Sequence, residues 1–314
     1  VDLPLMDVAA RVVRLRERLE SGGCDALLVT NLVNIRYLTG FTGSAAMLLV
    51  YPGGCLFVTD GRYLTQSAEE LDASGVPAAL AVGKVSEQRQ AIVGVATGLG
   101  RIGLEADHVT WAMQRQLAGE WFPGAEVVPT TDVVEGLRMV KDDGELARIE
   151  RAANIADAAL AEVLPLLAGG PTEAEFGLAL DFAMRRLGAE DVSFETIVAA
   201  GPNGAKPHAR PSTRPIARGE LIVCDFGALV DGYHSDMTRT VCVGEPADPV
   251  LGRMVEAVTA SQAAGVDSVA AGVQARAVDE ACRVILRQYG WEEAYLHGTG
   301  HGVGLDIHEA PGVN

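Results

Sequence analysis

Two strand-like runs separated by a single turn signal constrain this chain most. Residues 221–227 (LIVCDFG) and 233–243 (YHSDMTRTVCV) flank Asp231-Gly232, and an Asp-Gly pair between such runs is typical of a β-hairpin. The first arm carries Asp225, which we expect to face a core because it follows Ile-Val-Cys, and the second arm carries Asp236. Buried carboxylates repel each other unless a proton or a cation separates them. Either Asp alone reads as an ordinary strand or turn residue, but the pair predicts a divalent cation site.

A second concentration of functional residue types lies at residues 295–314 (YLHGTGHGVGLDIHEAPGVN). Here His297, His301 and His308 stand among glycines, and a fourth histidine, His208, lies in the segment AKPHARPS upstream of the hairpin. Histidine is the commonest neutral metal ligand and an acid or base near neutral pH. Glycine lets the backbone and a ligand approach each other closely. The segment therefore predicts that these histidines share a site with the hairpin.

The order and spacing of His208, the hairpin with its DxTRT ending, and HGTGHGVGLDIHE resemble the pita-bread metallopeptidases. These include Xaa-Pro aminopeptidases and prolidases, with methionine aminopeptidases and creatinase as more distant relatives. The resemblance implies that Asp225 binds one metal, that Asp236 bridges two, and that His301 binds the other. It further implies catalytic roles for His208 and His308, which stabilise the tetrahedral intermediate and orient the scissile amide. His297 is implied to be a substrate-binding residue near the proline pocket.

The cofactors implied by the resemblance are two divalent metal ions, with manganese first and cobalt or zinc as alternatives. The family completes its site with two glutamates that follow the HGxGHGxG stretch. Glu309 matches neither of them, and the sequence ends at Asn314. We therefore expect a catalytic domain that lacks its last strands, and the activity of the chain as it stands is left open.

The N-terminal part alternates strand-like and helix-like segments, which predicts an α/β domain with a mixed sheet. A helix is expected over residues 4–21, and residues 31–44 are expected to form an irregular link. The segments NIRYLTGFTGS and FVTDGRYLTQS resemble the creatinase-like N-terminal domain of prolidases and Xaa-Pro aminopeptidases. Methionine aminopeptidases lack this domain, so its presence favours a proline-directed enzyme. Arg62 and Tyr63 are candidates for contacts with an active site or a partner subunit.

The predicted fold class is an α/β N-terminal domain at residues 1–138 followed by an α+β pita-bread domain at residues 139–314. A long amphipathic helix opens the second domain. Thr172 and Glu175 fit a capping box at the start of the next helix. Two further helices are expected after the hairpin, over 249–271 and 274–289. The stripe expected to face the core on the first helix consists of Leu146, Ile149, Ala153, Ala156, Leu160 and Val163.

Composition excludes several classes of protein. The net charge of −17 argues against nucleic-acid binding, which needs a basic surface. The five cysteines are an odd number without a CxxC pair, which predicts reduced thiols in a cytoplasmic protein. No apolar stretch is expected to reach membrane length, so no membrane partner is predicted. The resemblance implies a homodimer.

The predicted function is a metal-dependent peptidase that hydrolyses the Xaa-Pro bond at the N-terminus of peptides or in dipeptides. Three alternatives remain open. A catalytically impaired pita-bread scaffold would bind no metal, and a creatinase-like hydrolase would need none. A methionine aminopeptidase would prefer a Met-Ala substrate over Ala-Pro.

Overall fold

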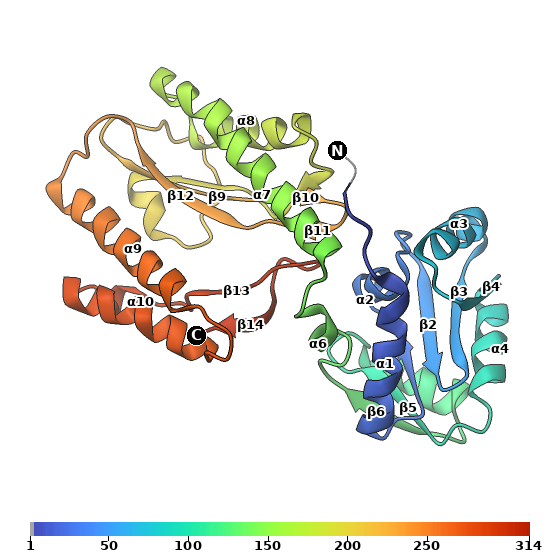
Figure 1. The fold of residues 1–314 in the computed structure, drawn as a ribbon. Helices are drawn as coiled ribbons and strands as arrows, with labels where there is room; N and C mark the ends of the chain where they lie inside the picture. The colour runs from blue at the N-terminus through green and yellow to red at the C-terminus, as the bar shows by residue number, and fades with distance from the viewer. Residues whose placement is uncertain (1–2) are drawn as a thin grey trace. The chain divides into compact units, whose positions relative to one another are not determined.

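A computed structural model describes residues 3–314, which divide into two compact units (Figure 1). One unit is Leu5–Gly144, and the other consists of Glu145–Asn314 together with the described residues up to Pro4. The sequence placed the boundary between residues 138 and 139, and the division in the structure lies between residues 144 and 145. Both positions fall inside the charged segment of residues 134–150 (VEGLRMVKDDGELARIE).

The N-terminal unit is built on a six-stranded mixed sheet with the strand order β4-β3-β2-β1-β5-β6. The pairs β1–β2 and β2–β3 are antiparallel, whereas β3–β4, β1–β5 and β5–β6 are parallel. Its elements are α1 (Val8–Gly22), β1 (Ala26–Val29), α2 (Leu32–Thr39), β2 (Ala46–Tyr51), β3 (Gly54–Thr59), η1 (Gly61–Tyr63), α3 (Leu64–Ser74), β4 (Ala78–Val82), α4 (Val85–Ala96), β5 (Arg101–Glu105), α5 (Trp111–Gln116), η2 (Leu117–Trp121), β6 (Glu126–Thr130) and α6 (Glu135–Arg138). The predicted α/β domain with a mixed sheet is confirmed.

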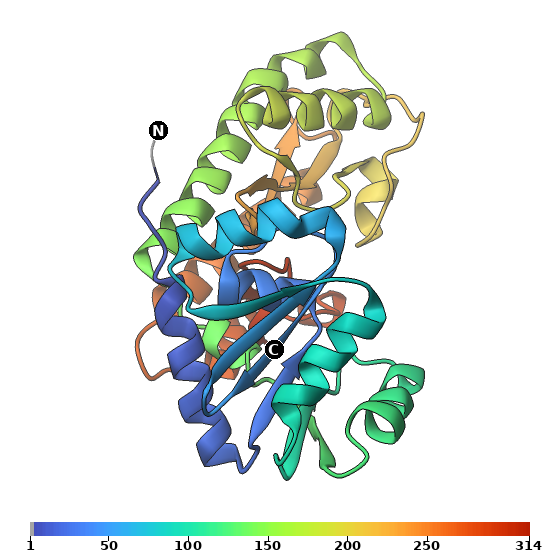
Figure 2. The same ribbon diagram turned by 90° about the vertical axis from the view of Figure 1, so that its right-hand side faces the viewer.

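Helices cover both faces of this sheet (Figure 2). Ile92 and Ala96 of α4, with Leu117 and Trp121 of η2, pack on one face. On the other side, α1 and α2 contact β2. Because both faces are covered, all four residues of β1 are buried. Burial on two faces explains why this strand is a continuous apolar run rather than an alternating one.

The expectation of an irregular link at residues 31–44 is wrong. Residues 32–39 form α2, which the Asn31 side chain caps by accepting a hydrogen bond from the Val33 backbone N–H. Gly40 ends the helix in the left-handed conformation, with a φ of 76°. Ile35 and Leu38 are fully buried, so tertiary packing stabilises a helix that is too short to be stable alone.

The C-terminal unit contains two three-stranded sheets, β11-β10-β7 and β12-β9-β8, and a two-stranded ribbon of β13 and β14. In Figure 1, α7 and α8 lie beside the sheet with β9 and β12, and α9 packs along α10. Its elements are α7 (Asp143–Val163), η3 (Leu164–Gly169), α8 (Glu173–Arg186), β7 (Asp191–Val192), β8 (Ile197–Ala200), η4 (Gly201–Ala205), β9 (Leu221–Phe226), β10 (Ala228–Val230), β11 (Tyr233–His234), β12 (Met237–Cys242), α9 (Pro249–Ser268), α10 (Ala275–Tyr289), η5 (Glu292–Ala294), β13 (Gly300–Gly302) and β14 (Glu309–Val313).

Several local signals predicted this unit correctly. Thr172 and Glu175 form the capping box at the start of α8, with each side chain accepting a hydrogen bond from the backbone N–H of the other residue. Gly290 ends α10 with a φ of 79°. Asp231 and Gly232 both have positive φ, which is the conformation that a two-residue hairpin turn between β10 and β11 requires.

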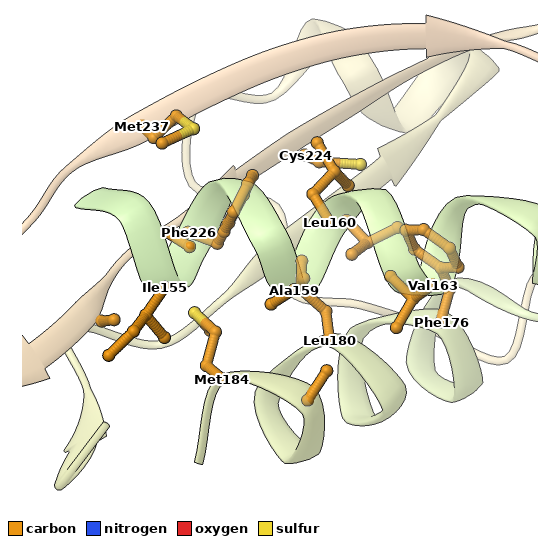
Figure 3. Close-up of a cluster of buried hydrophobic side chains, with 14 of the residues drawn as sticks. Ile155, Ala159, Leu160, Val163, Phe176, Leu180, Met184, Cys224, Phe226 and Met237 are labelled. Carbon is orange, nitrogen blue, oxygen red and sulfur yellow. The ribbon is translucent and has the colours of Figure 1, made fainter. Parts of the chain in front are cut away.

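The core of this unit lies between α7, α8 and the sheet (Figure 3). The stripe of α7 that faces it differs from the predicted one, because Leu146 is 52% exposed and Ile149 and Ala153 are only partly buried. The predicted stripe lies on the correct helix. In the first two turns, however, the predicted residues are turned toward solvent. The buried residues of α7 are Ala152, Ile155, Ala156, Ala159, Leu160 and Val163.

The expectation that no apolar stretch reaches membrane length is also wrong. Residues 143–169 contain an 18-residue window with a mean hydropathy of 1.3, which is long and apolar enough to cross a membrane by length and composition alone. The helix at the core of a soluble protein passes the same test. Since one face of α7 forms the core, we interpret the segment as a core helix.

Gly227 connects β9 to β10 at a very close approach between two chain segments. A Cβ atom built on Gly227 would lie 1.9 Å from the backbone oxygen of Ser235 and 2.8 Å from the Ser193 Cβ. The nearest atom belongs to the backbone, so it cannot move aside as the end of a flexible side chain could. Only glycine therefore lets the strand pass from one sheet to the other here.

We expect Gly227→Ala to destabilise the protein by more than about 2 kcal/mol, because the methyl group overlaps backbone atoms. The matched control is Gly252→Ala on the exposed side of α9, where a Cβ meets nothing within 4 Å. That change is expected to be neutral or to stabilise by up to about 1 kcal/mol. Urea unfolding followed by circular dichroism compares the two variants, and equal midpoints would contradict the packing argument.

Candidate active site

Asp225 lies in the middle of the sheet but does not face the core, contrary to the sequence expectation. Along β9 the side chains of Ile222, Cys224 and Phe226 are buried in the core, and Asp225 therefore points to the opposite face. Its pairing partner across the sheet is Thr238 of β12. The Thr238 hydroxyl donates a hydrogen bond of 2.9 Å to Oδ1 of Asp225.

Asp225 is partly desolvated and lies among charged groups. Burial raises the pKa of Asp225, the hydrogen bond from Thr238 opposes this rise, and the nearby charge of Asp236 adds to it. His208 and His301 lie near enough to lower the same pKa by attraction. These four residues therefore share one electrostatic environment, although they come from three separate stretches of the sequence.

Asp236 meets His301 directly. Asp236 lies between β11 and β12, and His301 lies in β13. The Nε2 atom of His301 is 3.3 Å from Oδ2 of Asp236. One backbone hydrogen bond helps to bring these segments together, because the His234 N–H donates to the Gly304 oxygen over 2.8 Å. The Gly-rich segment is thereby attached to the hairpin that the sequence predicted it to join.

The orientation of the His301 ring is set by its other ring nitrogen. Nδ1 lies 2.9 Å from the backbone oxygen of Gly302, and a carbonyl oxygen can only accept, so Nδ1 carries the proton. In the neutral ring, Nε2 then presents a lone pair to a carboxylate oxygen of Asp236. Two such atoms face each other stably when a proton or a cation lies between them. Carboxylate oxygens with one imidazole nitrogen form a donor set that suits manganese, cobalt or zinc.

The remaining three predicted histidines are all exposed and differ in what they contact. The His308 ring packs on His301 with a centroid separation of 4.3 Å, so it stands beside the Asp236–His301 pair. His297 is exposed, and its ring contacts Tyr295 at 4.5 Å. His208 is exposed on the loop that follows η4, and the electrostatic effect on Asp225 is the interaction that links it to the site.

Within residues 3–314, no three potential metal-ligand side chains gather closely enough to surround an ion as they stand. The structure thus brings Asp236 and His301 into contact, with Asp225 on the neighbouring strand, and leaves His208 and His297 further out. The chemistry of the donors fits a divalent cation. The ligand roles of these residues remain predictions.

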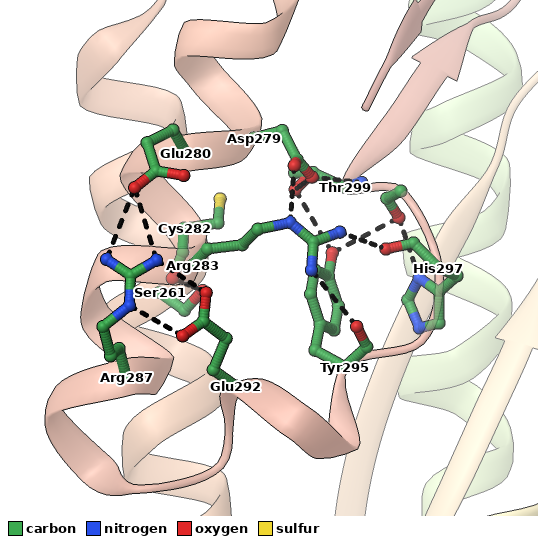
Figure 4. Close-up of polar contacts among 11 residues, drawn as sticks. Ser261, Asp279, Glu280, Cys282, Arg283, Arg287, Glu292, Tyr295, His297 and Thr299 are labelled. Atoms are coloured by element: carbon green, nitrogen blue, oxygen red, sulfur yellow. Dashed lines mark hydrogen bonds and ion pairs between the residues drawn. The ribbon is translucent and has the colours of Figure 1, made fainter.

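A polar network on α10 supports the Gly-rich segment (Figure 4). Asp279 accepts hydrogen bonds from the Thr299 hydroxyl (2.7 Å) and backbone N–H (3.2 Å), and it forms a 2.6 Å ion pair with Arg283. The Arg283 guanidinium donates to the backbone oxygens of Tyr295 and His297. The network therefore holds residues 295–299 in place. Sequence reasoning missed it, because an Asp and an Arg four residues apart on a helix usually form only a surface pair.

His234 is a second residue that sequence reasoning passed over. Its Nδ1 lies 2.8 Å from the Ser193 hydroxyl oxygen and 3.1 Å from the Ser193 backbone oxygen. Burial lowers the pKa of His234, which favours the neutral ring, although hydrogen bonds and nearby carboxylates oppose this shift. The sequence signal that could have identified His234 is its position in YHSD, two residues before Asp236.

The cysteines take no part in the site. All five are free, and Cys224 is buried with a pKa raised to about 12 by burial. A thiol with so high a pKa is a poor metal ligand, because the thiolate is the form that binds metal. Cys224 therefore fills space in the core, and Cys242 is only partly buried.

Two family models match this chain and together cover nearly all of it. Residues 147–314 match the metallopeptidase family M24, and residues 11–140 match the creatinase/prolidase N-terminal domain. The chain belongs to metallopeptidase family M24. Its C-terminal unit accordingly has the pita-bread fold, and its N-terminal unit is the creatinase-type domain of M24 enzymes, as the sequence predicted.

Relatives within the M24 family match along almost the entire chain. An uncharacterized peptidase of Bacillus subtilis, YqhT, is 34% identical over 97% of this chain and 85% of its own length. A protein of Pyrococcus horikoshii named Xaa-Pro dipeptidase is 31% identical over 97% of this chain and 84% of its own length. Among solved structures, Xaa-Pro dipeptidase from Bacillus anthracis has a TM-score of 0.92 at 36% identity, covering 98% of this chain and 84% of that one.

Arg62 and Tyr63, the candidates in the N-terminal unit, form a local surface cluster. Arg62 makes a 2.8 Å ion pair with Asp60, and its guanidinium stands 5.3 Å from the centre of the Tyr63 ring. The Tyr63 hydroxyl is hydrogen-bonded to the Ser44 hydroxyl. A contact of this cluster with an active site stays a prediction.

We expect Asp279→Asn to destabilise the metal-free protein by about 1–3 kcal/mol at pH 7, because it weakens buried charge-assisted hydrogen bonds. Burial raises the pKa of Asp279, but the hydrogen bonds from Arg283 and Thr299 outweigh it and the net pKa is lowered. A carboxyl group whose pKa is lowered by folding stabilises the fold at pH values above its unfolded-state pKa of about 4. This stabilisation is lost as the pH falls.

Thermal melts in EDTA at pH 7, 5 and 3.5 would measure this effect. The difference between wild type and Asp279→Asn should shrink as the pH falls. Glu280→Gln is the control, since Glu280 is exposed and contacts Arg287 only at 3.4 Å. A difference that stays constant with pH would show that ionised Asp279 is not what stabilises the Gly-rich segment.

Proposed function

We propose that this protein is a metal-dependent peptidase that hydrolyses the Xaa-Pro bond at the N-terminus of peptides or in dipeptides. The observation that carries the proposal is the 3.3 Å contact of Asp236 Oδ2 with Nε2 of His301, beside Asp225 on the paired strand. The creatinase/prolidase N-terminal domain supports a proline-directed activity, as do the similar proteins named Xaa-Pro dipeptidase.

In this proposal Asp225, Asp236 and His301 hold two divalent metal ions, with manganese the first choice and cobalt or zinc the alternatives. When bound, such ions supply an activated water and polarise the carbonyl that is attacked. Asp225 comes from β9, and Asp236 immediately precedes β12, the antiparallel partner of β9. The hydrogen bond from His301 Nδ1 to Gly302 fixes the ring so that Nε2 faces Asp236.

The other histidines contact the substrate in this proposal. His208 donates a hydrogen bond to the oxygen that becomes negative during attack, which lowers the barrier to the tetrahedral intermediate. His308, whose ring lies against His301, orients the scissile amide. His297, exposed beside Tyr295, lines the pocket for the proline ring. Proline lacks an amide N–H, so the apolar edge of such a pocket can recognise it without an unpaired donor.

The proposal extends to compartment and assembly. Five free thiols support a reducing compartment and hence the cytoplasm. The family resemblance supports a homodimer. The substrate is a proline-containing dipeptide or peptide, and neither nucleic acid nor membrane is a proposed partner.

The first test compares Ala-Pro, Ala-Pro-Ala and Met-Ala as substrates of the protein incubated with manganese, with bound metal measured by elemental mass spectrometry. We expect at least about tenfold higher kcat/KM for the Xaa-Pro substrates, equal to about 1.4 kcal/mol of transition-state stabilisation. Preference for Met-Ala would point to a methionine aminopeptidase. Hydrolysis that survives removal of all metal would point to a creatinase-like enzyme. The absence of both bound metal and hydrolysis would point to a scaffold that binds no metal and cleaves no substrate.

The second test separates metal ligands from substrate contacts. Asp236→Asn should abolish metal binding and hydrolysis together, because a neutral amide would replace a carboxylate that is proposed to hold the metal. His308→Ala should keep the metal and lower kcat by about 10²–10⁴-fold, the range for a lost acid–base or polarising group. Activity retained by Asp236→Asn would rule out the two-metal model, and metal lost from His308→Ala would reassign His308 as a ligand.

A further inference from the structure

Glu173 is a fully buried carboxylate that the proposed mechanism does not use. It is the first residue of α8, follows the N-cap residue Thr172, and has 0% of its surface exposed. The capping box at this helix end uses Glu175, so capping does not explain Glu173. A carboxylate is seldom buried completely unless hydrogen bonds satisfy it.

The hydrogen bonds of Glu173 come from both ends of the loop that carries His208. At the near end, the Ala200 N–H donates over 2.7 Å and the Asn203 side-chain amide reaches both carboxylate oxygens at 3.0 Å. At the far end, the Ser212 hydroxyl donates over 2.6 Å and the Ser212 N–H over 3.1 Å. One side chain thus joins residues on either side of His208.

The backbone at the start of α8 strengthens this attachment. The N–H of Glu173 donates to the Arg214 oxygen over 3.0 Å, and the N–H of Ala174 donates to the Ser212 oxygen over 2.9 Å. The first N–H groups of a helix have no partner within the helix, so the loop supplies partners for them. Burial raises the pKa of Glu173, but the hydrogen bonds lower it more, and the helix N-terminus also favours the ionised form.

His208 itself is held only through the loop backbone. Its side chain is exposed, and within residues 3–314 no hydrogen bond fixes its imidazole. Pro207 and Pro211 restrict the backbone on either side of it. The position of the imidazole relative to Asp225 therefore depends on where the two ends of the loop are anchored.

We propose that Glu173 is a positioning residue that acts through the loop of residues 201–212 to hold His208 in place for catalysis. This inference rests on the proposed function, in which His208 stabilises the developing oxyanion. A shift of about 1 Å in such a group costs up to about 100-fold in rate. Glu173 is distant in sequence from every predicted site residue and touches none of the candidate metal ligands.

The first measurement is hydrogen–deuterium exchange of the metal-free protein, which does not depend on activity. Glu173→Gln replaces one acceptor oxygen with an NH2 group that faces donors, so amides in residues 201–212 should exchange faster than in wild type. Glu175→Gln is the matched control, because Glu175 lies on the same helix turn but accepts from Thr172 and not from the loop. In Glu175→Gln, the amides of residues 201–212 should exchange at the wild-type rate.

The second measurement is a double-mutant cycle on Xaa-Pro hydrolysis by the metal-loaded protein. Glu173→Gln should lower kcat by about 10- to 100-fold with a smaller change in KM, as expected for a misplaced catalytic group. In the His208→Ala background the same substitution should change kcat by less than about twofold, because residues that act as a unit are not additive.

The inference is overturned if residues 201–212 of Glu173→Gln exchange at the wild-type rate. It is also overturned if the fold-losses in kcat caused by Glu173→Gln and His208→Ala multiply in the double variant. If Glu173→Gln does not fold, Ser212→Ala removes one donor from the same carboxylate and should give smaller changes in the same direction. If wild type cleaves no Xaa-Pro peptide, the proposed function fails, and the exchange measurement still decides whether Glu173 holds the loop.

Discussion

The antiparallel pairing of β9 with β12 is the interaction on which the candidate site depends. It runs in continuous register from Met237 opposite Phe226 to Cys242 opposite Leu221. Because successive side chains of a strand point to opposite faces, this one register places Cys224 and Phe226 in the core and Asp225 on the other side. A slip of one residue would bury the carboxylate and expose the aromatic ring. Core packing therefore fixes the direction of the candidate ligand.

Near this pair of strands, each of two helices anchors one loop of the candidate site. The N-terminus of α8 anchors the loop with His208 through Glu173, and α10 anchors the segment with His297 through Asp279 and Arg283. In both cases a nearly buried carboxylate on a helix accepts hydrogen bonds from loop backbone and hydroxyl groups. Flexible segments rich in glycine and proline thus gain fixed positions from rigid elements that belong to the core.

Local signals allowed much of this architecture to be predicted from the sequence. The Asp-Gly turn, the capping box at Thr172 and the apolar runs of the N-terminal sheet depend on residues close together in the chain. The direction of Asp225 was misjudged, although the alternation of Ile222, Cys224 and Phe226 contained the answer. The helix at residues 32–39 was missed because its stability comes from tertiary packing that buries Ile35 and Leu38 completely. The role of Glu173 could not be predicted, since its partners lie 27 to 39 residues further along the chain.

The hydrogen bond between His234 and Gly304 also bears on how the protein matures. It closes a loop of about seventy residues, so the chain must give up considerable conformational freedom before Asp236 and His301 can meet. During synthesis the hairpin leaves the ribosome several seconds before residue 304, at the usual rates of translation. The nascent hairpin therefore exposes unshielded carboxylates, without their imidazole partner, until the Gly-rich segment arrives. Asp236 and His301 can therefore hold a cation together only after the Gly-rich segment has docked on the hairpin.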